Sequence, residues 1–132
     1  MKGKVTGVGG IFFKSRDPEA LRTWYRDMLG IDVQPWGGVA FRWRDGAPDG
    51  AGTTVWSPFK HDTTYFEPGT KDFMINLRVD DLEALLAKLR SAGAQVPARG
   101  EASEFGKFGY VLDPENNLVE LWQPPADEAT KG

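Results

Sequence analysis

The stretch DPEALRTWYRDMLGIDV (residues 17–33) reads as a helix with marked ends, and it has a counterpart later in the chain. Asp17 or Ser15 is suited to the N-cap, Pro18 to the first turn, and Gly30 to the end of the helix. Its apolar residues recur at the spacing of one helical face, namely Leu21, Trp24, Tyr25, Met28 and Leu29. The pattern predicts an amphipathic helix with one apolar stripe.

The counterpart is DDLEALLAKLRSAGAQV (residues 80–96), where Gly93 ends a second predicted helix. Its apolar stripe consists of Leu82, Leu85, Leu86 and Leu89. Aspartate, glycine and valine recur at one constant offset of 63 residues, in the pairs Asp17 and Asp80, Gly30 and Gly93, and Val33 and Val96. The chain therefore reads as the same unit used twice.

Strand-like segments surround both helices. Before and after the first helix they are residues 5–14, 32–36, 38–43 and 52–57, and around the second they are 73–79, 108–113 and 118–122. The turn PENN (114–117) between the last two suits a type I turn with one left-handed residue. These segments predict two strand–helix–strand modules, at about 5–58 and 71–123.

Length and composition narrow the class of protein. The 132 residues suffice for one domain, which we expect to span residues 1–132. A net charge of −3 gives no basic footprint for nucleic acid, and the absence of cysteine excludes disulfides. The N-terminal segment lacks the apolar run of a signal peptide, and no later segment resembles a membrane span. We therefore expect a cytoplasmic protein with no membrane partner.

Two βαβββ modules in about 130 residues, with the stretches DPEALRTWYRDMLGI, VDDLEALLAKLRSAGAQV and DPENNLVEL, resemble the vicinal oxygen chelate superfamily. That superfamily includes glyoxalase I, bleomycin resistance proteins and extradiol dioxygenases. The resemblance implies an α+β fold in which eight strands form an incompletely closed barrel with the helices outside. It also implies a ligand site in the concave interior and a homodimer.

In metal-dependent members, four strands each supply one metal ligand. The resemblance places these slots at Gly10, Trp56, Met74 and Glu120. Only Glu120 offers a donor that suits a hard or borderline divalent metal. The single histidine, His61, falls in the segment between the modules, as a solvated residue or as a lid residue beside Tyr65 or Phe66. We therefore predict no metal and no cofactor.

The two-residue period of strands predicts which side chains face the interior. In the segment 73–79, the inward residues would be Met74, Asn76 and Arg78, with Ile75, Leu77 and Val79 toward the helices. By the same parity the predicted inward set includes Gly10, Phe12, Thr54, Trp56, Leu118, Glu120 and Trp122. The sequence leaves open which face of residues 38–44 lines the cavity.

Glu120 is a lone carboxylate among apolar neighbours, so it must pair, bind a cation or raise its pKa. It could be a structural partner of Arg78, an anchor for a ligand amine or hydroxyl, or a general base. The aromatic residues could fill a closed core or form a ligand shelf.

Three functions remain open from the sequence. The first is a metal-free, bleomycin-resistance-like protein that binds a small, partly aromatic molecule through Phe12, Thr54, Trp56, Met74, Asn76, Arg78, Glu120 and Trp122. The second is a glyoxalase-like lyase or a dioxygenase-related enzyme that uses Glu120 as acid, base or metal ligand. The third is an interaction module whose cavity is filled by its own side chains.

Overall fold

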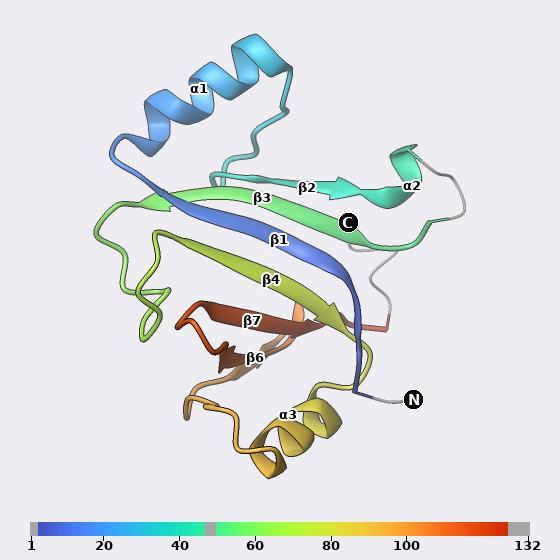
Figure 1. The fold of residues 1–132 in the computed structure, drawn as a ribbon. Coiled ribbons are helices and arrows are strands. Elements are labelled where there is room, and N and C mark those ends of the chain that lie inside the picture. The colour runs from blue at the N-terminus through green and yellow to red at the C-terminus, as the bar shows by residue number, and fades with distance from the viewer. Residues whose placement is uncertain (1–2, 47–49, 127–132) are drawn as a thin grey trace.

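The computed structural model describes residues 3–46 and 50–126, which form an α+β fold. Within these residues one seven-stranded sheet has the order β2-β3-β1-β4-β7-β6-β5 and curls into a half-barrel (Figure 1). The strands are β1 (Val5–Ser15), β2 (Val39–Arg42), β3 (Thr53–Lys60), β4 (Phe73–Val79), β5 (Glu101–Ser103), β6 (Gly106–Leu112) and β7 (Leu118–Gln123). The helices are α1 (Pro18–Leu29), the single turn α2 (Trp43–Gly46) and α3 (Leu82–Ser91).

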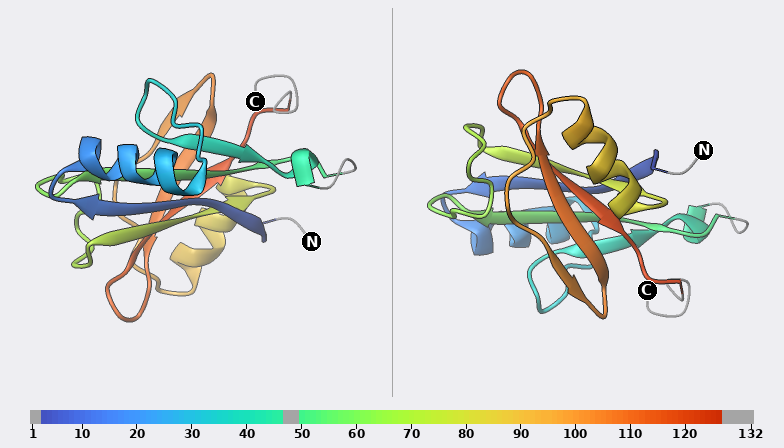
Figure 2. Two further views of the ribbon diagram at one scale, coloured as in Figure 1. Left: turned by 90° about the horizontal axis from the view of Figure 1, so that it is seen from above. Right: turned by 90° about the horizontal axis from the view of Figure 1, so that it is seen from below.

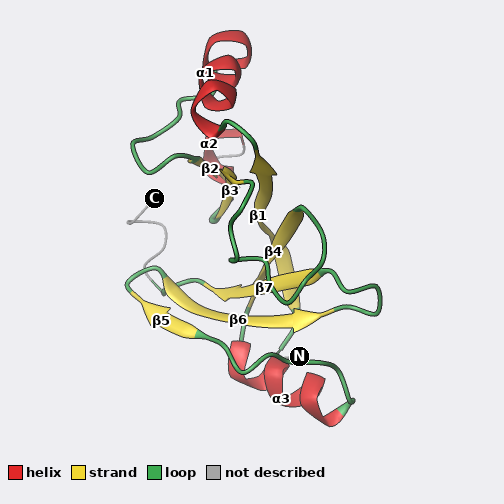
Figure 3. Cartoon of the chain, turned by 90° about the vertical axis from the view of Figure 1, so that its left-hand side faces the viewer, coloured by secondary structure: helices red, strands yellow, loops and turns green. Residues whose placement is uncertain are grey.

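The strand pairing repeats between the two halves of the sheet. Strand β1 runs parallel to β3, and β4 runs parallel to β7. Each parallel pair is extended by an antiparallel neighbour, β2 beside β3 and β6 beside β7. The antiparallel pair of β1 and β4 joins the halves. Figure 2 shows β6 and β7 crossing β1 and β3 at a steep angle, and Figure 3 shows α1 and α3 at opposite ends of the curled sheet.

Both predicted helices form, and α1 has the predicted ends. The N-cap of α3 is Asp81, one residue after the Asp80 that the repeat aligns with Asp17. The Asp17 side chain accepts a hydrogen bond from the Ala20 backbone N–H at 3.1 Å, and Asp81 caps α3 through Ala84 at the same distance. Gly30 and Gly93 adopt the left-handed φ angles of 71° and 83° that glycine tolerates best.

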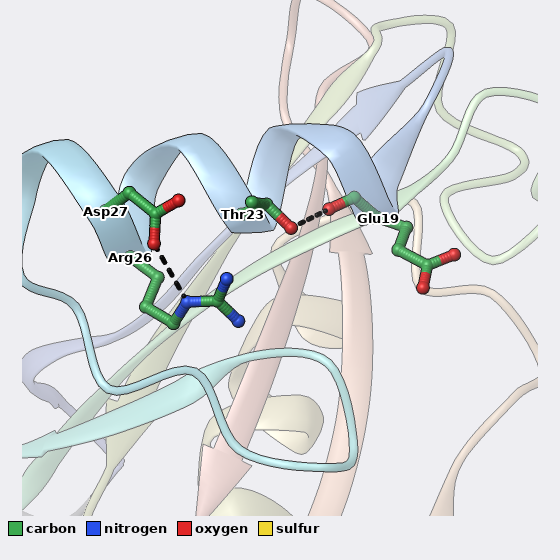
Figure 4. Close-up of polar contacts among 4 residues, drawn as sticks. All are labelled: Glu19, Thr23, Arg26 and Asp27. Atoms are coloured by element: carbon green, nitrogen blue, oxygen red, sulfur yellow. Dashed lines mark hydrogen bonds and ion pairs between the residues drawn. The ribbon is translucent and has the colours of Figure 1, made fainter.

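The apolar stripe of α1 is not covered within the described residues. Trp24, Met28 and Leu29 are 51%, 66% and 61% exposed, and no residue of the helix is buried. Helix α1 contacts β3 through Tyr25, whose ring lies 4.7 Å from that of Trp56, and through Arg22, which donates to the Pro58 carbonyl at 3.1 Å. Figure 4 shows polar contacts along the helix, including the ion pair of Arg26 with Asp27. Periodicity identified the residues that share a face but not what lies opposite them.

The prediction of a strand at residues 32–36 is wrong. The chain turns here instead, with hydrogen bonds from the Gln34 N–H to the Gly38 carbonyl and from the Gly37 N–H to the Gln34 carbonyl. Pro35 has no N–H for a ladder, and Gly37 has a φ of 103°. Conversely, β5 forms at residues 101–103, where no strand was predicted.

The final hairpin has the predicted turn. Asn116 adopts a positive φ of 66°, and the Asp113 carboxylate accepts hydrogen bonds from the backbone N–H groups of Glu115 and Asn117. This closed turn sets the register of β6 against β7, in which Tyr110 lies directly opposite Glu120.

Two apolar clusters form the core, one on each face of the sheet. Under α3 lie Val79, Leu82, Leu85 and Leu121. On the concave face lie Phe12, Phe66, Met74, Tyr110 and Leu118. Phe66 comes from the loop between β3 and β4 and is 1% exposed, so this loop packs onto the concave face rather than standing at a cavity mouth.

Candidate functional site

The sheet register brings a row of polar residues together on the concave face. Gly10 pairs with Asn76, Asn76 with Glu120, and Glu120 with Tyr110, across four neighbouring strands. Residues directly opposite on neighbouring strands point to the same side of the sheet. Asn76, Glu120 and Tyr110 are 2%, 1% and 1% exposed, so this row is buried.

The Glu120 carboxylate accepts three hydrogen bonds from neutral donors. Its Oε2 atom accepts from the Tyr65 hydroxyl at 2.5 Å and from the Tyr110 hydroxyl at 2.7 Å. Its Oε1 atom accepts from Asn76 Nδ2 at 2.7 Å. An ionised carboxylate offers about four acceptor positions, so three of them are occupied by the chain itself.

The two tyrosines are held in their neutral form. Burial raises the pKa of Tyr65 and of Tyr110 well above the usual tyrosine range, and the negative charge of Glu120 raises both further. The two hydroxyls lie 3.0 Å apart. A negative charge on either tyrosine would be repelled by the Glu120 carboxylate. Both tyrosines therefore keep their protons, and both hydroxyls stay available as donors.

Arg99 supplies positive charge behind the tyrosines. Its guanidinium lies 4.5 Å from the ring centre of Tyr65 and 4.0 Å from that of Tyr110. The same group donates hydrogen bonds to the backbone carbonyls of Tyr65 and Glu67. Arg99 therefore holds the loop between β3 and β4 in the position where Tyr65 reaches Glu120.

Arg78 does not hydrogen bond to Glu120, so the alternative in which Glu120 is its structural partner is not the one that forms. Its guanidinium lies 4.9 Å from the ring centre of Trp43 and 5.1 Å from that of Trp122, within the range of cation–π contacts. Trp122 is half-buried and stacks nearly parallel on Phe108 at 6.1 Å. One end of the concave face is thus a group of aromatic rings around one cation.

One polar atom of the row has no partner among the described residues. Asn76 Oδ1 is buried and accepts no hydrogen bond there, although the Nδ2 atom of the same amide donates to Glu120. Gly9 permits this packing, because a Cβ at that position would lie 2.1 Å from Asn76 Oδ1. Buried acceptors of this kind call for an explanation, commonly a water or a ligand.

The residues present do not fit the divalent metal that the superfamily implies. The register places Val55 and Asn76, rather than Trp56 and Met74, in the row with Gly10 and Glu120. Neither glycine nor valine offers a donor, and the Glu120 oxygens already accept three hydrogen bonds. Within the described chain no three His, Cys, Asp or Glu residues lie close enough to share a metal.

The residues predicted for the site on β1, β4 and β7 fall into two groups, one in the packed core of the concave face and one around Glu120 and Arg78. The parity of β4 is confirmed, since Met74, Asn76 and Arg78 are buried on the concave side. Phe12 and Met74 belong to the packed core there, at 8% and 0% exposure. Trp122, Asn76, Arg78 and Glu120 lie in neighbouring rows.

The inward placement of Trp56 is wrong. Trp56 packs on Tyr25 of α1, on the opposite face of the sheet. Thr54 accepts a hydrogen bond from Trp43 Nε1 and donates to the Val8 carbonyl, so its hydroxyl contacts the tryptophan that lies beside Arg78. Strand β3 is apolar on both faces, so its period does not distinguish them.

The register of β2 against β3 also shows which face of residues 38–44 lies on the concave side. Ala40 lies opposite Val55 of the concave core, and Arg42 opposite Thr53, so Ala40 and Arg42 share the concave face. His61 is exposed, whereas the neighbouring loop residues Tyr65 and Phe66 are turned into the protein.

Three residues that contact Glu120, its tyrosine partners or Arg78 were not predicted from the sequence, namely Tyr110, Arg99 and Trp43. Tyr110 could have been found, because the PENN turn fixes a hairpin in which it faces Glu120. Arg99 lies in an irregular segment and Trp43 in the single turn α2, where no periodicity shows what they contact.

Comparison with known proteins identifies the fold. A family model described as a glyoxalase-like domain matches residues 10–122. Among solved structures, the methylmalonyl-CoA epimerase of Mycobacterium tuberculosis is 19% identical, with a TM-score of 0.59, and the match covers 96% of this chain and 93% of that one. A variant of the Streptomyces coelicolor methylmalonyl-CoA epimerase is 19% identical, with a TM-score of 0.64 and coverage of 95% and 99%.

A glyoxalase/bleomycin resistance protein/dioxygenase superfamily member from Vibrio splendidus is 15% identical, with a TM-score of 0.55 and coverage of 91% and 99%. A search of curated proteins gives no significant match. Among the described residues no helix is long and apolar enough to cross a membrane. Because the family match spans most of its length, the chain belongs to the glyoxalase-like domain family of the vicinal oxygen chelate superfamily.

Proposed function

We propose that the protein binds a small, partly aromatic molecule on the concave face of the half-barrel without the help of a metal. The single domain would consist of two modules, at about 5–58 and 71–123, whose repeated strand pairing supports this division. The proposed ligand site is the end of the concave face where Asn76 and Arg78 adjoin the Trp122 ring.

The aromatic pair of Trp122 and Phe108 beside the Arg78 guanidinium carries this proposal. Both rings are half-buried, and the Arg78 guanidinium lies 5.1 Å from the ring centre of Trp122. The half-buried pair of Trp122 and Phe108 offers an aromatic surface in the adjoining row. Apolar walls with a few orienting polar groups are typical of small-molecule sites.

Phe12 and Met74 pack with the loop residue Phe66 in the core of the concave face. They therefore support the proposed ligand site and do not line it. An interaction module with a closed cavity, the third function considered above, would have the same packing of side chains on the concave face. This packing occupies the row of Phe12, Met74 and Leu118, whereas Arg78 and Trp122 lie four residues further along β4 and β7.

A catalytic role for Glu120 is less well supported. The epimerases and the superfamily member above share the fold, but a general base must reach its substrate. Glu120 is 1% exposed and already accepts three hydrogen bonds. We therefore assign it to organising the concave face.

A thermal-shift screen with aromatic antibiotics, flavonoids and glutathione adducts tests the proposal. A ligand at a hundred times its dissociation constant should add about 2.7 kcal/mol to the stability of the folded state. Trp122→Leu should abolish this gain, whereas Phe73→Leu, at a 44% exposed aromatic residue at the other end of β4 from Arg78, should retain it. A screen without any stabilising compound, or a gain that survives Trp122→Leu, would contradict the proposal.

A homodimer belongs to the same proposal. The exposed apolar residues of α1 and the following loop, Trp24, Met28, Leu29 and Trp36, are the surface that a second copy would cover. Contiguous apolar surface of this kind is typical of protein interfaces.

A further inference from the structure

A cavity lies where β1 and β3 end and β4 begins, apart from the Glu120 row. It has a volume of about 670 Å³ and is lined by Lys14, Arg16, His61 and Asp72. The topology creates it, because the parallel strands β1 and β3 end side by side, with Ser15 opposite Lys60. Strand β4 begins at the same edge, where the Lys14 N–H donates to the Asp72 carbonyl.

The lining of this cavity is positively charged, although the whole chain has a net charge of −3. Lys14 Nζ lies 3.8 Å from Asp72 Oδ1, so the positive charge of Lys14 balances the negative charge of Asp72, the single carboxylate in the lining. The Asp72 side chain is 89% exposed and its charge is well solvated. Arg16 and the imidazole of His61 then remain as surplus donors.

Neither Arg16 nor His61 forms a hydrogen bond or an ion pair with another residue in the described part of the chain, and both are exposed. Their donors are therefore available to a ligand without breaking an existing contact. Lys14 is fixed between Asp72 and the ring of Phe66, which lies 6.0 Å away. One anchored cation and two available donors thus surround the same cavity.

We propose that this cavity binds the phosphate group of a small molecule. The planar guanidinium of Arg16 can donate two parallel hydrogen bonds to a tetrahedral oxyanion, and Lys14 adds a compact charge. The volume lies within the roughly 300–1,000 Å³ of small-molecule sites, which leaves room for more than the phosphate. This site is independent of the ligand proposed for the concave face.

Amide NMR titrations of the full chain test this proposal at constant ionic strength, with chloride as the balancing anion. The probes are inorganic phosphate, glycerol phosphate as a phosphate monoester, and acetate as a carboxylate. Saturable shifts are expected around residues 14–16 and 60–62 for both phosphates, with acetate binding more weakly. Tighter binding of the ester assigns the cavity to a phosphorylated molecule, and equal binding assigns it to free phosphate.

Arg16→Gln should weaken phosphate binding about tenfold or more, because charge-assisted hydrogen bonds contribute roughly 1.5–3 kcal/mol. Arg90→Gln, at an exposed arginine in α3, is the matched control and should leave binding unchanged. The proposal is overturned if phosphate causes no saturable shift, if acetate binds as tightly as phosphate, or if the two variants weaken binding equally.

Discussion

Replacing Glu120 by alanine should lower the free energy of unfolding by about 3–5 kcal/mol. The carboxylate is the common acceptor of Tyr65, Tyr110 and Asn76. Buried donors left without an acceptor cost roughly 1–3 kcal/mol each, and the truncation adds a cavity. The two tyrosine hydroxyls lie 3.0 Å apart and can satisfy only one donor between them.

Urea or guanidinium unfolding of the purified variant measures this change. Glu104→Ala, in the exposed turn between β5 and β6, is the matched control and should remain within about 0.5 kcal/mol of the parent protein. Glu120→Gln, which keeps the shape and one acceptor oxygen, should fall between the two. A Glu120→Ala protein as stable as the Glu104→Ala control would show that the carboxylate does not organise the concave face.

The stability of the protein should fall steeply above about pH 10, the ordinary pKa of tyrosine. The pKa values of Tyr65 and Tyr110 are raised in the folded state by burial and by the charge of Glu120. Above the unfolded pKa, the unfolded chain releases these protons while the folded chain keeps them. The stabilisation is therefore fully present below about pH 10 and is lost as the pH rises, by about 1.4 kcal/mol per pH unit for each tyrosine.

Unfolding free energies measured across this pH range, together with the ultraviolet absorbance of tyrosinate, test the linkage. Tyr65→Phe and Tyr110→Phe should each reduce the slope by the contribution of one tyrosine. An unchanged slope in both variants would mean that neither hydroxyl is protected by the contact with Glu120.

Local sequence signals predicted those parts of the fold that depend on neighbouring residues. The caps Asp17 and Asp81 hold their own helices, and the turn at Asp113 is closed by contacts within five residues. In the glycine-rich β1, Gly9 lies against the Asn76 amide, at a close approach of the kind for which glycine is suited.

Features that depend on distant contacts could not be read in the same way. The face of β3 was misassigned because Val55 and Trp56 are both apolar, one toward the concave core and one toward α1. The exposure of the α1 stripe depends on what lies opposite the helix, which periodicity does not specify.

The contacts of Glu120 also depend on residues that are distant in the sequence. Its position as a buried carboxylate was expected, but its partners were not. Tyr65 comes from a loop 55 residues earlier in the chain, and Arg99 reaches both tyrosine rings from another irregular segment. Only Tyr110 and Asn76, its direct neighbours in the sheet, could have been obtained from strand register.

The central claim is that the Glu120 carboxylate is engaged by neutral donors of its own chain in place of a metal. Calorimetric titration of the metal-stripped protein with zinc, nickel and manganese tests this most directly. We predict no stoichiometric binding of any of the three ions, in the parent protein as in Glu120→Gln. Tight binding of one ion per chain that disappears in Glu120→Gln would contradict the account.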